Sequence, residues 1–95
     1  MSFTLEMTSQ VEQQIHDIMA DKSKGGLQKQ LKKALRLLSE NPKHPGLNSH
    51  PIGDIDGVKI WTSYVRYNTP QAHRILWSYA IIKNTIYILQ LIPHY

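Results

Sequence analysis

Four side chains in the C-terminal third of the sequence could together carry out chemistry on a phosphate. They are Arg66, Arg74, His94 and Tyr95. Two guanidinium groups can hold the oxygens of a phosphate and the negative charge that builds up on it in a transition state. A histidine that titrates near neutral pH can give or take a proton, and a tyrosine can stack on a base or donate a hydrogen bond.

RNA would suit such a set of residues, because its own 2′-hydroxyl can attack the neighbouring phosphodiester. The protein then only has to move protons and stabilise the charged phosphorus centre. Each of these residues also has an ordinary structural explanation, since histidines at strand ends are commonly surface groups and strand arginines commonly pair with carboxylates. The pattern alone leaves both explanations open.

The histidines of the sequence do not form a recognisable metal-binding motif. They are His16, His44, His50, His73 and His94. None of the short paired spacings of zinc sites occurs among them, and the sequence contains no cysteine to complete such a site. We therefore expect no metal ion and no cofactor.

The N-terminal part of the sequence predicts a short strand followed by two helices. Residues 2–8 alternate between apolar and polar side chains, which is the two-residue period of a strand. A capping-box pattern that starts at Ser9 then predicts a helix over residues 9–21. A second amphipathic helix is expected over residues 26–41, because the proline that follows would end it there.

Strand-like runs dominate the second half of the sequence. Residues 41–57 are rich in proline and glycine and predict a loop with at most one short strand. Residues 58–67, 73–82 and 85–93 predict strands of a mostly antiparallel sheet, in which the last two are central because they are apolar on both faces. We therefore expect a single α+β domain over residues 1–95, with two N-terminal helices packed on this small sheet.

A turn at Lys83–Asn84 would bring the candidate site together. Antiparallel pairing across this turn places Arg74 opposite Pro93 or His94 at one edge of the sheet. The neighbours of this pair would be His73, Tyr95, Arg66 and Tyr67. The strands therefore predict that the terminal histidine lies beside the arginine, where a loose chain end could not hold it.

Positive charge is concentrated after the first predicted helix. All eleven Lys and Arg lie after residue 21, and the formal net charge is +4. Such a basic body attracts polyanions such as nucleic acid, or an acidic protein, although a solvated lysine-rich surface is the alternative. The residues that we expect to contact an RNA backbone are Lys29, Lys32, Lys33, Arg36, Lys43 and Lys59.

No segment of the sequence has the pattern of a signal peptide, and no apolar run approaches the roughly 20 residues that span a bilayer. The absence of cysteine agrees with a reducing compartment. We expect a cytoplasmic protein without a membrane partner.

Three stretches of the sequence carry family-like motifs. They are LQKQLKKALRLLSENPKHPGLNSHPI (27–52), KIWTSYVRYNTPQAHRILWSY (59–79) and TIYILQLIPHY (85–95). Together they resemble the RelE/ParE superfamily of bacterial type II toxins, and more narrowly its RelE-like branch with the His-Tyr terminus of YoeB-like members. The resemblance covers nearly the whole chain and is most specific over residues 59–79 and 93–95.

The resemblance implies a RelE-like microbial ribonuclease fold and the function of a toxin that inhibits translation. Many RelE-like members are mRNA endoribonucleases that need no metal ion, often act on the ribosome and leave a 2′,3′-cyclic phosphate. By this likeness Arg74 would clamp the scissile phosphate, His94 would act as general acid and base, Tyr95 would position the substrate, and Arg66 would be a second phosphate ligand. The expected partners are a cognate antitoxin, mRNA and the ribosome, in a homodimer or a toxin–antitoxin hetero-oligomer.

The sequence departs from the YoeB-like pattern at the general base. Those relatives place a catalytic glutamate before the middle strands, where this chain has Lys43, His44 and His50 and no carboxylate until Asp54. One of the two loop histidines, His44 or His50, could replace the glutamate. The alternative is a non-catalytic or ParE-like member that acts by binding gyrase or only its antitoxin, since a shared fold does not settle function.

Overall fold

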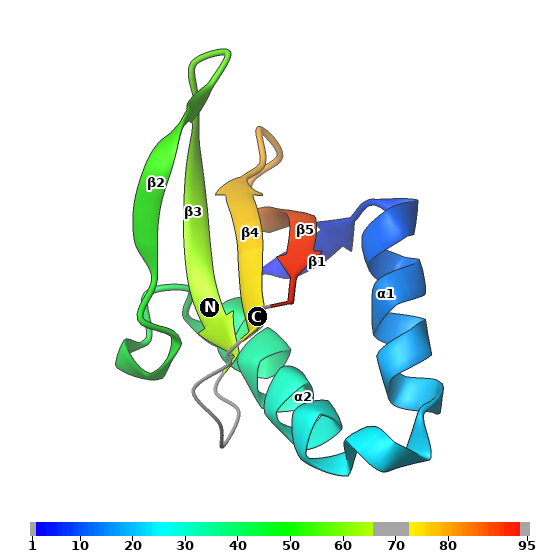
Figure 1. Cartoon of the computed structure of the whole chain (residues 1–95). Coiled ribbons are helices and arrows are strands. Elements are labelled where there is room, and N and C mark those ends of the chain that lie inside the picture. The colour runs from blue at the N-terminus through cyan, green and yellow to red at the C-terminus, as the bar shows by residue number, and fades with distance from the viewer. Residues whose placement is uncertain (1, 66–72, 94–95) are drawn as a thin grey trace.

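A computed structural model defines residues 2–65 and 73–93 of the chain, and it consists of one sheet with two helices against one of its faces (Figure 1). The elements are β1 (Thr4–Met7), α1 (Ser9–Ala20), the short 3-10 helix η1 (Lys22–Lys24), α2 (Gly25–Glu40), the short 3-10 helix η2 (Pro45–Leu47), β2 (His50–Ile55), β3 (Val58–Val65), β4 (His73–Tyr79) and β5 (Thr85–Ile92). The predicted α+β class, with two helices packed on a mostly antiparallel sheet, is confirmed.

The sheet has the strand order β1-β5-β4-β3-β2. The pairs from β2 to β5 are antiparallel, and β1 alone runs parallel to its neighbour, with Thr4 opposite Thr85. The two apolar runs that were expected to be central do form inner strands, because β4 lies in the middle of the sheet and β5 beside it. None of the helices in the described ranges is long and apolar enough to cross a membrane.

The N-cap of the first helix lies one residue earlier than the capping box predicts. Thr8 is the N-cap, and its side-chain oxygen accepts a hydrogen bond of 3.1 Å from the backbone N–H of Val11. Ser9 already belongs to the helix. Thr8 and Ser9 both have a hydroxyl that could cap the helix. Thr8 is the N-cap because its backbone is extended, as the N-cap position requires.

The core lies between the helices and the sheet. Val11 and Ile18 of α1 and Leu31 and Leu38 of α2 are buried against the apolar side chains of β3, β4 and β5. These positions follow the three- and four-residue spacing of one helix face, which is why the amphipathic pattern located both helices. Full burial of a leucine or isoleucine side chain stabilises the fold by about 1.5–3 kcal/mol.

The register between the last two strands differs from the prediction. Arg74 lies opposite Ile92, and a bulge between Leu76 and Trp77 shifts the pairing again. The tight turn that was expected at Lys83–Asn84 is wider, because Ala80 and Thr85 close it with a hydrogen bond of 3.0 Å. Ile81 and Ile82, which were expected in the strand, therefore lie exposed in the turn. These two isoleucines are therefore apolar surface residues and do not belong to a central strand.

The loop predicted before the middle strands contains a complete strand. β2 pairs with β3 as a hairpin whose turn is Asp56–Gly57, and both of these residues have a positive φ. Asp-Gly is a preferred pair for such a turn, because its backbone twist matches that of the strands. Every residue of β2 is exposed, and a bulge between Pro51 and Gly53 interrupts its pairing.

A buried chain of hydrogen bonds fixes the segment between α2 and β2 to the sheet. The indole Nε1 of Trp77 donates to the hydroxyl of Ser63 at 2.7 Å, and this hydroxyl lies 2.6 Å from that of Ser49. The Ser49 hydroxyl donates in turn to the carbonyl oxygen of Pro42 at 2.7 Å. The segment from Pro42 to Ser49, which carries His44 and leads directly into His50, is therefore anchored at its two ends.

Candidate active site

The candidate site lies on the sheet face that the helices leave open. Val65 of β3 and Ile75 of β4 belong to the core beneath the helices. Successive side chains point to opposite faces of a sheet, so their neighbours Tyr64 and Arg74 leave the core on the other side. Tyr64 and Arg74 are also direct partners in the pairing of β3 with β4.

A shallow cavity of about 150 Å³ surrounds the arginine on this face. Its lining consists of Ile52, Thr62, Arg74, Leu76, Ile92 and Pro93. The hydroxyl oxygen of Thr62 is buried there and has no hydrogen-bond partner. Because this oxygen is covered by its neighbours, the guanidinium of Arg74 is the donor through which this cavity can hold an anion.

The side chains of His50, Tyr64 and Arg74 form a row. The guanidinium carbon of Arg74 lies 5.4 Å from the centre of the Tyr64 ring, within the range of a cation–π contact. The ring of His50 stacks on the same tyrosine, with 6.0 Å between the centroids and 29° between the planes. Tyr64 therefore holds the arginine and the histidine together, and we refer to these three residues as the His50–Tyr64–Arg74 row.

The hydrogen bond of His50 determines which of its nitrogens can accept a proton. Nδ1 lies 3.1 Å from the carbonyl oxygen of Asn48. A carbonyl oxygen only accepts, so Nδ1 must carry the proton in this contact. In the neutral ring Nε2 is then free of a proton, as a general base requires.

The second loop histidine has the opposite arrangement. Nδ1 of His44 accepts a hydrogen bond of 2.9 Å from the backbone N–H of Gly46. The proton of the neutral ring is therefore on Nε2, which makes His44 a donor toward a ligand. His44 lies in the loop beside α2 and is not part of the row. The structure thus separates the two residues that the sequence offered equally as bases.

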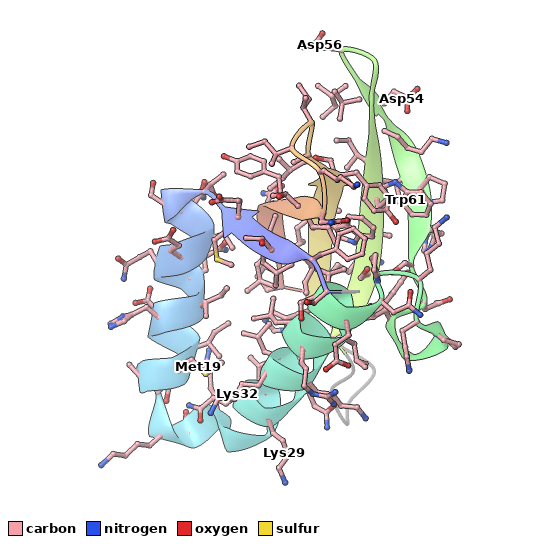
Figure 2. The ribbon with its side chains drawn as sticks, turned by 180° about the vertical axis from the view of Figure 1, so that it is seen from behind. Met19, Lys29, Lys32, Asp54, Asp56 and Trp61 are labelled. Carbon is pink, nitrogen blue, oxygen red and sulfur yellow. The ribbon has the colours of Figure 1, made fainter. Side chains whose placement is uncertain are left out.

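The predicted RNA-contacting residues lie in several different places. Lys29 and Lys32 project from α2 at the end of the molecule opposite the β2–β3 hairpin that carries Asp54 and Asp56 (Figure 2). Lys33, on the same helix, borders a cavity together with His44 and Tyr64. Arg36 forms an exposed salt bridge of 3.2 Å with Glu40, one turn further along α2. Their contact with RNA remains a prediction.

The other two predicted lysines lie away from Arg74. The ammonium group of Lys43 lies 5.3 Å from the centre of the Trp61 ring, on the core side of β3. Lys59 pairs with Asp54 in the β2–β3 hairpin. It is five residues from Tyr64 along β3, or about 17 Å at the usual rise of a strand. The predicted site residues Arg66, His94 and Tyr95 lie outside the described residues.

His73 does not join the candidate site, although the predicted register made it a neighbour. It lines a cavity on the helix side of the sheet together with Gln14, Asp17 and Lys24. The reason is the alternation of the strand, since His73 and Arg74 point to opposite faces. Burial, and to a smaller extent the charge of Lys24, lowers the pKa of His73. Its Nδ1 is buried and has no hydrogen-bond partner.

Sequence reasoning missed Tyr64 and Thr62 as site residues. An aromatic or β-branched residue in a strand usually packs in a core, so neither type attracts attention by itself. The register of β3 against β4 was the signal that could have found them. Tyr64 and Thr62 lie opposite Arg74 and Leu76, so they share the face of the arginine.

Comparison of the whole fold with solved structures gives one informative match. It is a chain of the crystal structure of the archaeal RelE-RelB complex from Pyrococcus horikoshii OT3, with a TM-score of 0.69. The alignment covers 98% of this chain and 96% of that chain. This protein has the RelE fold. The two RelE-like sequences are only 14% identical, so the likeness concerns the arrangement of helices and strands.

No protein-family model matches the sequence, and no curated protein matches it significantly. Within residues 2–65 and 73–93, no group of three or more His, Asp or Glu side chains has an arrangement that could hold a metal ion.

Proposed function

We propose that this protein is the toxin of a toxin–antitoxin pair and that it inhibits translation by cleaving mRNA. The observation that carries the proposal is the His50–Tyr64–Arg74 row on the open face of a RelE fold. The row combines an anion-binding group with a proton acceptor, which are the two functions that cleavage by the 2′-hydroxyl needs.

The proposed reaction uses these groups in a defined order. Nε2 of His50 takes the proton of the 2′-hydroxyl, and the 2′-oxygen attacks the adjacent phosphorus. The bond from phosphorus to the 5′-oxygen breaks, and that oxygen receives a proton from the general acid, for which the sequence offers His94. The products are a 2′,3′-cyclic phosphate and a free 5′-hydroxyl. Arg74 holds the non-bridging oxygens, where negative charge increases.

A partner protein is the second part of the proposal. The structurally similar chain was crystallised in a complex of RelE with RelB. We propose a corresponding antitoxin for this chain, in a hetero-oligomer that keeps the toxin inactive in the cytoplasm. Several large apolar side chains are exposed in the free chain and offer surface to such a partner. They are Ile52, Ile55, Val58, Tyr79, Ile81, Ile82 and Tyr87.

The proposal is tested by the purified protein acting on mRNA, alone and with ribosomes, with cleavage mapped by primer extension. Arg74→Ala should lower the cleavage rate about 100- to 1,000-fold, as expected when one donor to a developing charge is removed. Arg74→Lys should restore little, because an ammonium group lacks the planar fork of a guanidinium. Arg36→Ala removes the same charge from α2 and should change the rate only a few-fold.

The opposite result is equally definite. If Arg74→Ala still cleaves RNA at the wild-type rate while the protein stays folded, the proposed site is wrong. If no cleavage occurs at all but induced expression still arrests growth, the protein acts by binding, and inhibition of gyrase becomes the next measurement.

A further inference from the structure

Asn48, two residues before His50, has a left-handed backbone conformation. Its φ is 50° and its ψ is 44°. Residues other than glycine rarely adopt this conformation, and asparagine is one of the few that adopt it readily. The side chain of Asn48 is exposed, so packing does not explain why asparagine occupies this position. The backbone conformation does explain it.

The residues on both sides hold Asn48 in this conformation. Leu47 is completely buried in the core. The hydroxyl of Ser49 donates to the carbonyl oxygen of Pro42 at 2.7 Å. Asn48 itself ends η2, and its backbone N–H donates to the carbonyl oxygen of Pro45 at 3.2 Å. The chain therefore changes direction at one residue between two fixed neighbours, as it does at the left-handed residue that ends many helices.

The left-handed backbone determines where the carbonyl group of Asn48 points. Rotation about ψ turns this group, and the observed ψ of 44° brings its oxygen to 3.1 Å from Nδ1 of His50. In an extended backbone ψ lies between about 100° and 180°, so the carbonyl group would point in another direction. The hydrogen bond that fixes the proton of His50 thus depends on the backbone conformation of Asn48.

His50 is restricted from its other side as well. Pro51 follows it directly, and the residue before a proline is biased toward extended backbone. His50 begins the edge strand β2, where it lies opposite Thr62 and its side chain is exposed. Exposed side chains ordinarily change rotamer within nanoseconds. Here Asn48 and Pro51 restrict the backbone on both sides, and Tyr64 stacks on the ring.

We propose that Asn48 is a positioning residue for His50, and that its left-handed backbone holds the ring in the tautomer with the proton on Nδ1. Nε2 is then the nitrogen that accepts a proton. The contribution of Asn48 to RNA cleavage rests on the proposed function. The tautomer itself is a property of the free protein and is measured without RNA.

Long-range proton–nitrogen NMR spectra of the imidazole rings, in the isotope-labelled full-length protein, report the tautomer of each histidine. They are recorded at about pH 8.5, well above the ordinary pKa of a histidine, where the ring is neutral. The signals that disappear in His50→Gln are those of His50. In the wild type, His50 should carry its proton on Nδ1.

Three substitutions of Asn48 vary the strain of the left-handed backbone. Glycine adopts this conformation freely, alanine adopts it with strain, and the β-branched valine hardly adopts it at all. Asn48→Gly should keep the proton of His50 on Nδ1, whereas Asn48→Val should move it at least partly to Nε2. Asn48→Ala should give an intermediate population, and it takes the place of Asn48→Val if that variant does not fold.

Asn84 offers a matched control. It also has a left-handed backbone, with a φ of 57°, and lies in the turn between β4 and β5. Its carbonyl oxygen accepts a hydrogen bond of 2.8 Å from the backbone N–H of Thr4. Asn84→Val should therefore lower the thermal stability through the same strain and leave the tautomer of His50 unchanged.

RNA cleavage by the same variants measures the contribution of Asn48 to the reaction. A positioned general base contributes about 100- to 10,000-fold to a rate. Asn48→Val should lower the cleavage rate about 10-fold, because much of the His50 population then has its proton on the wrong nitrogen. Asn48→Gly should stay within about 3-fold of the wild type, which a loss of general stability would not explain.

The inference is overturned if His50 in the folded wild type carries its proton on Nε2. It is equally overturned if folded Asn48→Val, or Asn48→Ala in its place, keeps the proton on Nδ1. A similar change of tautomer in Asn84→Val would overturn it as well, because the change would then reflect lost stability. If the tautomer follows Asn48 as expected but the wild type does not cleave RNA, the inference stands and the proposed function fails alone. Thermal unfolding of each variant establishes that it is folded.

Discussion

The stacked ring of His50 is held on one side by Tyr64 and at Nδ1 by the carbonyl oxygen of Asn48. Together these contacts fix both the plane of the imidazole and the position of its proton. A general base depends on this orientation as much as on its acidity. A carboxylate base would need no such control of its tautomer, whereas His50 as the proposed base depends on its hydrogen bond with Asn48.

His73 provides a prediction about pH. Its pKa is lowered in the folded protein, first by burial and then by Lys24, so the folded state resists protonation. The unfolded chain binds a proton near its ordinary pKa of about 6.5. Stability should therefore be complete above about pH 6.5 and should fall as the pH drops from there toward the lowered pKa.

Urea denaturation of the wild type and of His73→Gln between pH 7.5 and pH 5 measures this effect. The loss of unfolding free energy over this range should be smaller in the variant. His16→Gln is the matched control, because His16 is exposed on α1. An identical pH dependence in wild type and His73→Gln would show that His73 does not resist protonation.

The sequence was a better guide to some site residues than to others. Arg74 stands out in the sequence, because a charged side chain within an apolar strand is conspicuous, and it lines the cavity on the open face. Its role in binding a phosphate stays a prediction. His44 and His50 could not be distinguished, because their roles depend on backbone groups at Gly46 and Asn48. No pattern of side-chain types records where a nearby N–H or C=O points.

At the scale of elements, the hydrogen-bond chain from Trp77 through Ser63 and Ser49 to Pro42 connects β4, β3 and the segment before β2. Ser63→Ala breaks this chain at its centre and leaves the buried indole N–H without a partner. The free energy of unfolding should fall by about 1–3 kcal/mol, the usual cost of a buried polar group without a partner. Chemical denaturation monitored by tryptophan fluorescence measures the change.

Ser39→Ala is the control for this variant. The Ser39 hydroxyl also donates to a backbone carbonyl, that of Arg36, but at an exposed position on α2. Its removal should change the stability by no more than about 0.5 kcal/mol. Equal effects of the two substitutions would mean that the chain contributes no more than a surface hydrogen bond.

Helices were easier to predict than strand pairing. The spacing of Leu27, Leu31 and Leu38 identifies a buried helix face from local sequence alone. The bulge in β4–β5 and the wide turn around Ile81 and Ile82 depend on contacts between distant residues. An apolar run cannot show where a strand ends, because exposed isoleucines in a turn look identical to buried ones in a sheet.

At the scale of the whole molecule, labelled side chains of opposite charge lie at opposite ends. Lys29 and Lys32 project at one end, and Asp54 and Asp56 lie in the hairpin at the other (Figure 2). If the lysine end contacts RNA, the logarithm of the binding constant falls linearly with the logarithm of the salt concentration. The slope is about −0.7 for each phosphate contact on a single strand.

The double variant Lys29→Ala/Lys32→Ala should therefore make this slope less steep by about 1.4. Fluorescence anisotropy with a labelled single-stranded RNA, at several concentrations of KCl, gives the slope. Lys83→Ala, in the turn between β4 and β5, should leave it unchanged. A double variant with the wild-type slope would assign these two lysines to a solvated surface.

The overall architecture was predictable because its order along the chain is simple. A strand, two helices and then strands with short connections lead to helices on one face of a largely antiparallel sheet. The position of the first strand was not predictable from this order. β1 is short, and its pattern gives no indication that its partner is β5.

This parallel pairing of β1 with β5 has a consequence for synthesis. A ribosome makes the N-terminal strand first, yet among the described strands its neighbour in the sheet is β5, the last of them along the sequence. Until β5 emerges, Leu5 and Met7 lack the strand that places them in the core, and β4 lacks its neighbour. The sheet that carries Arg74 is therefore complete only after β5 has been made, so the proposed cleavage of RNA would not begin before that point.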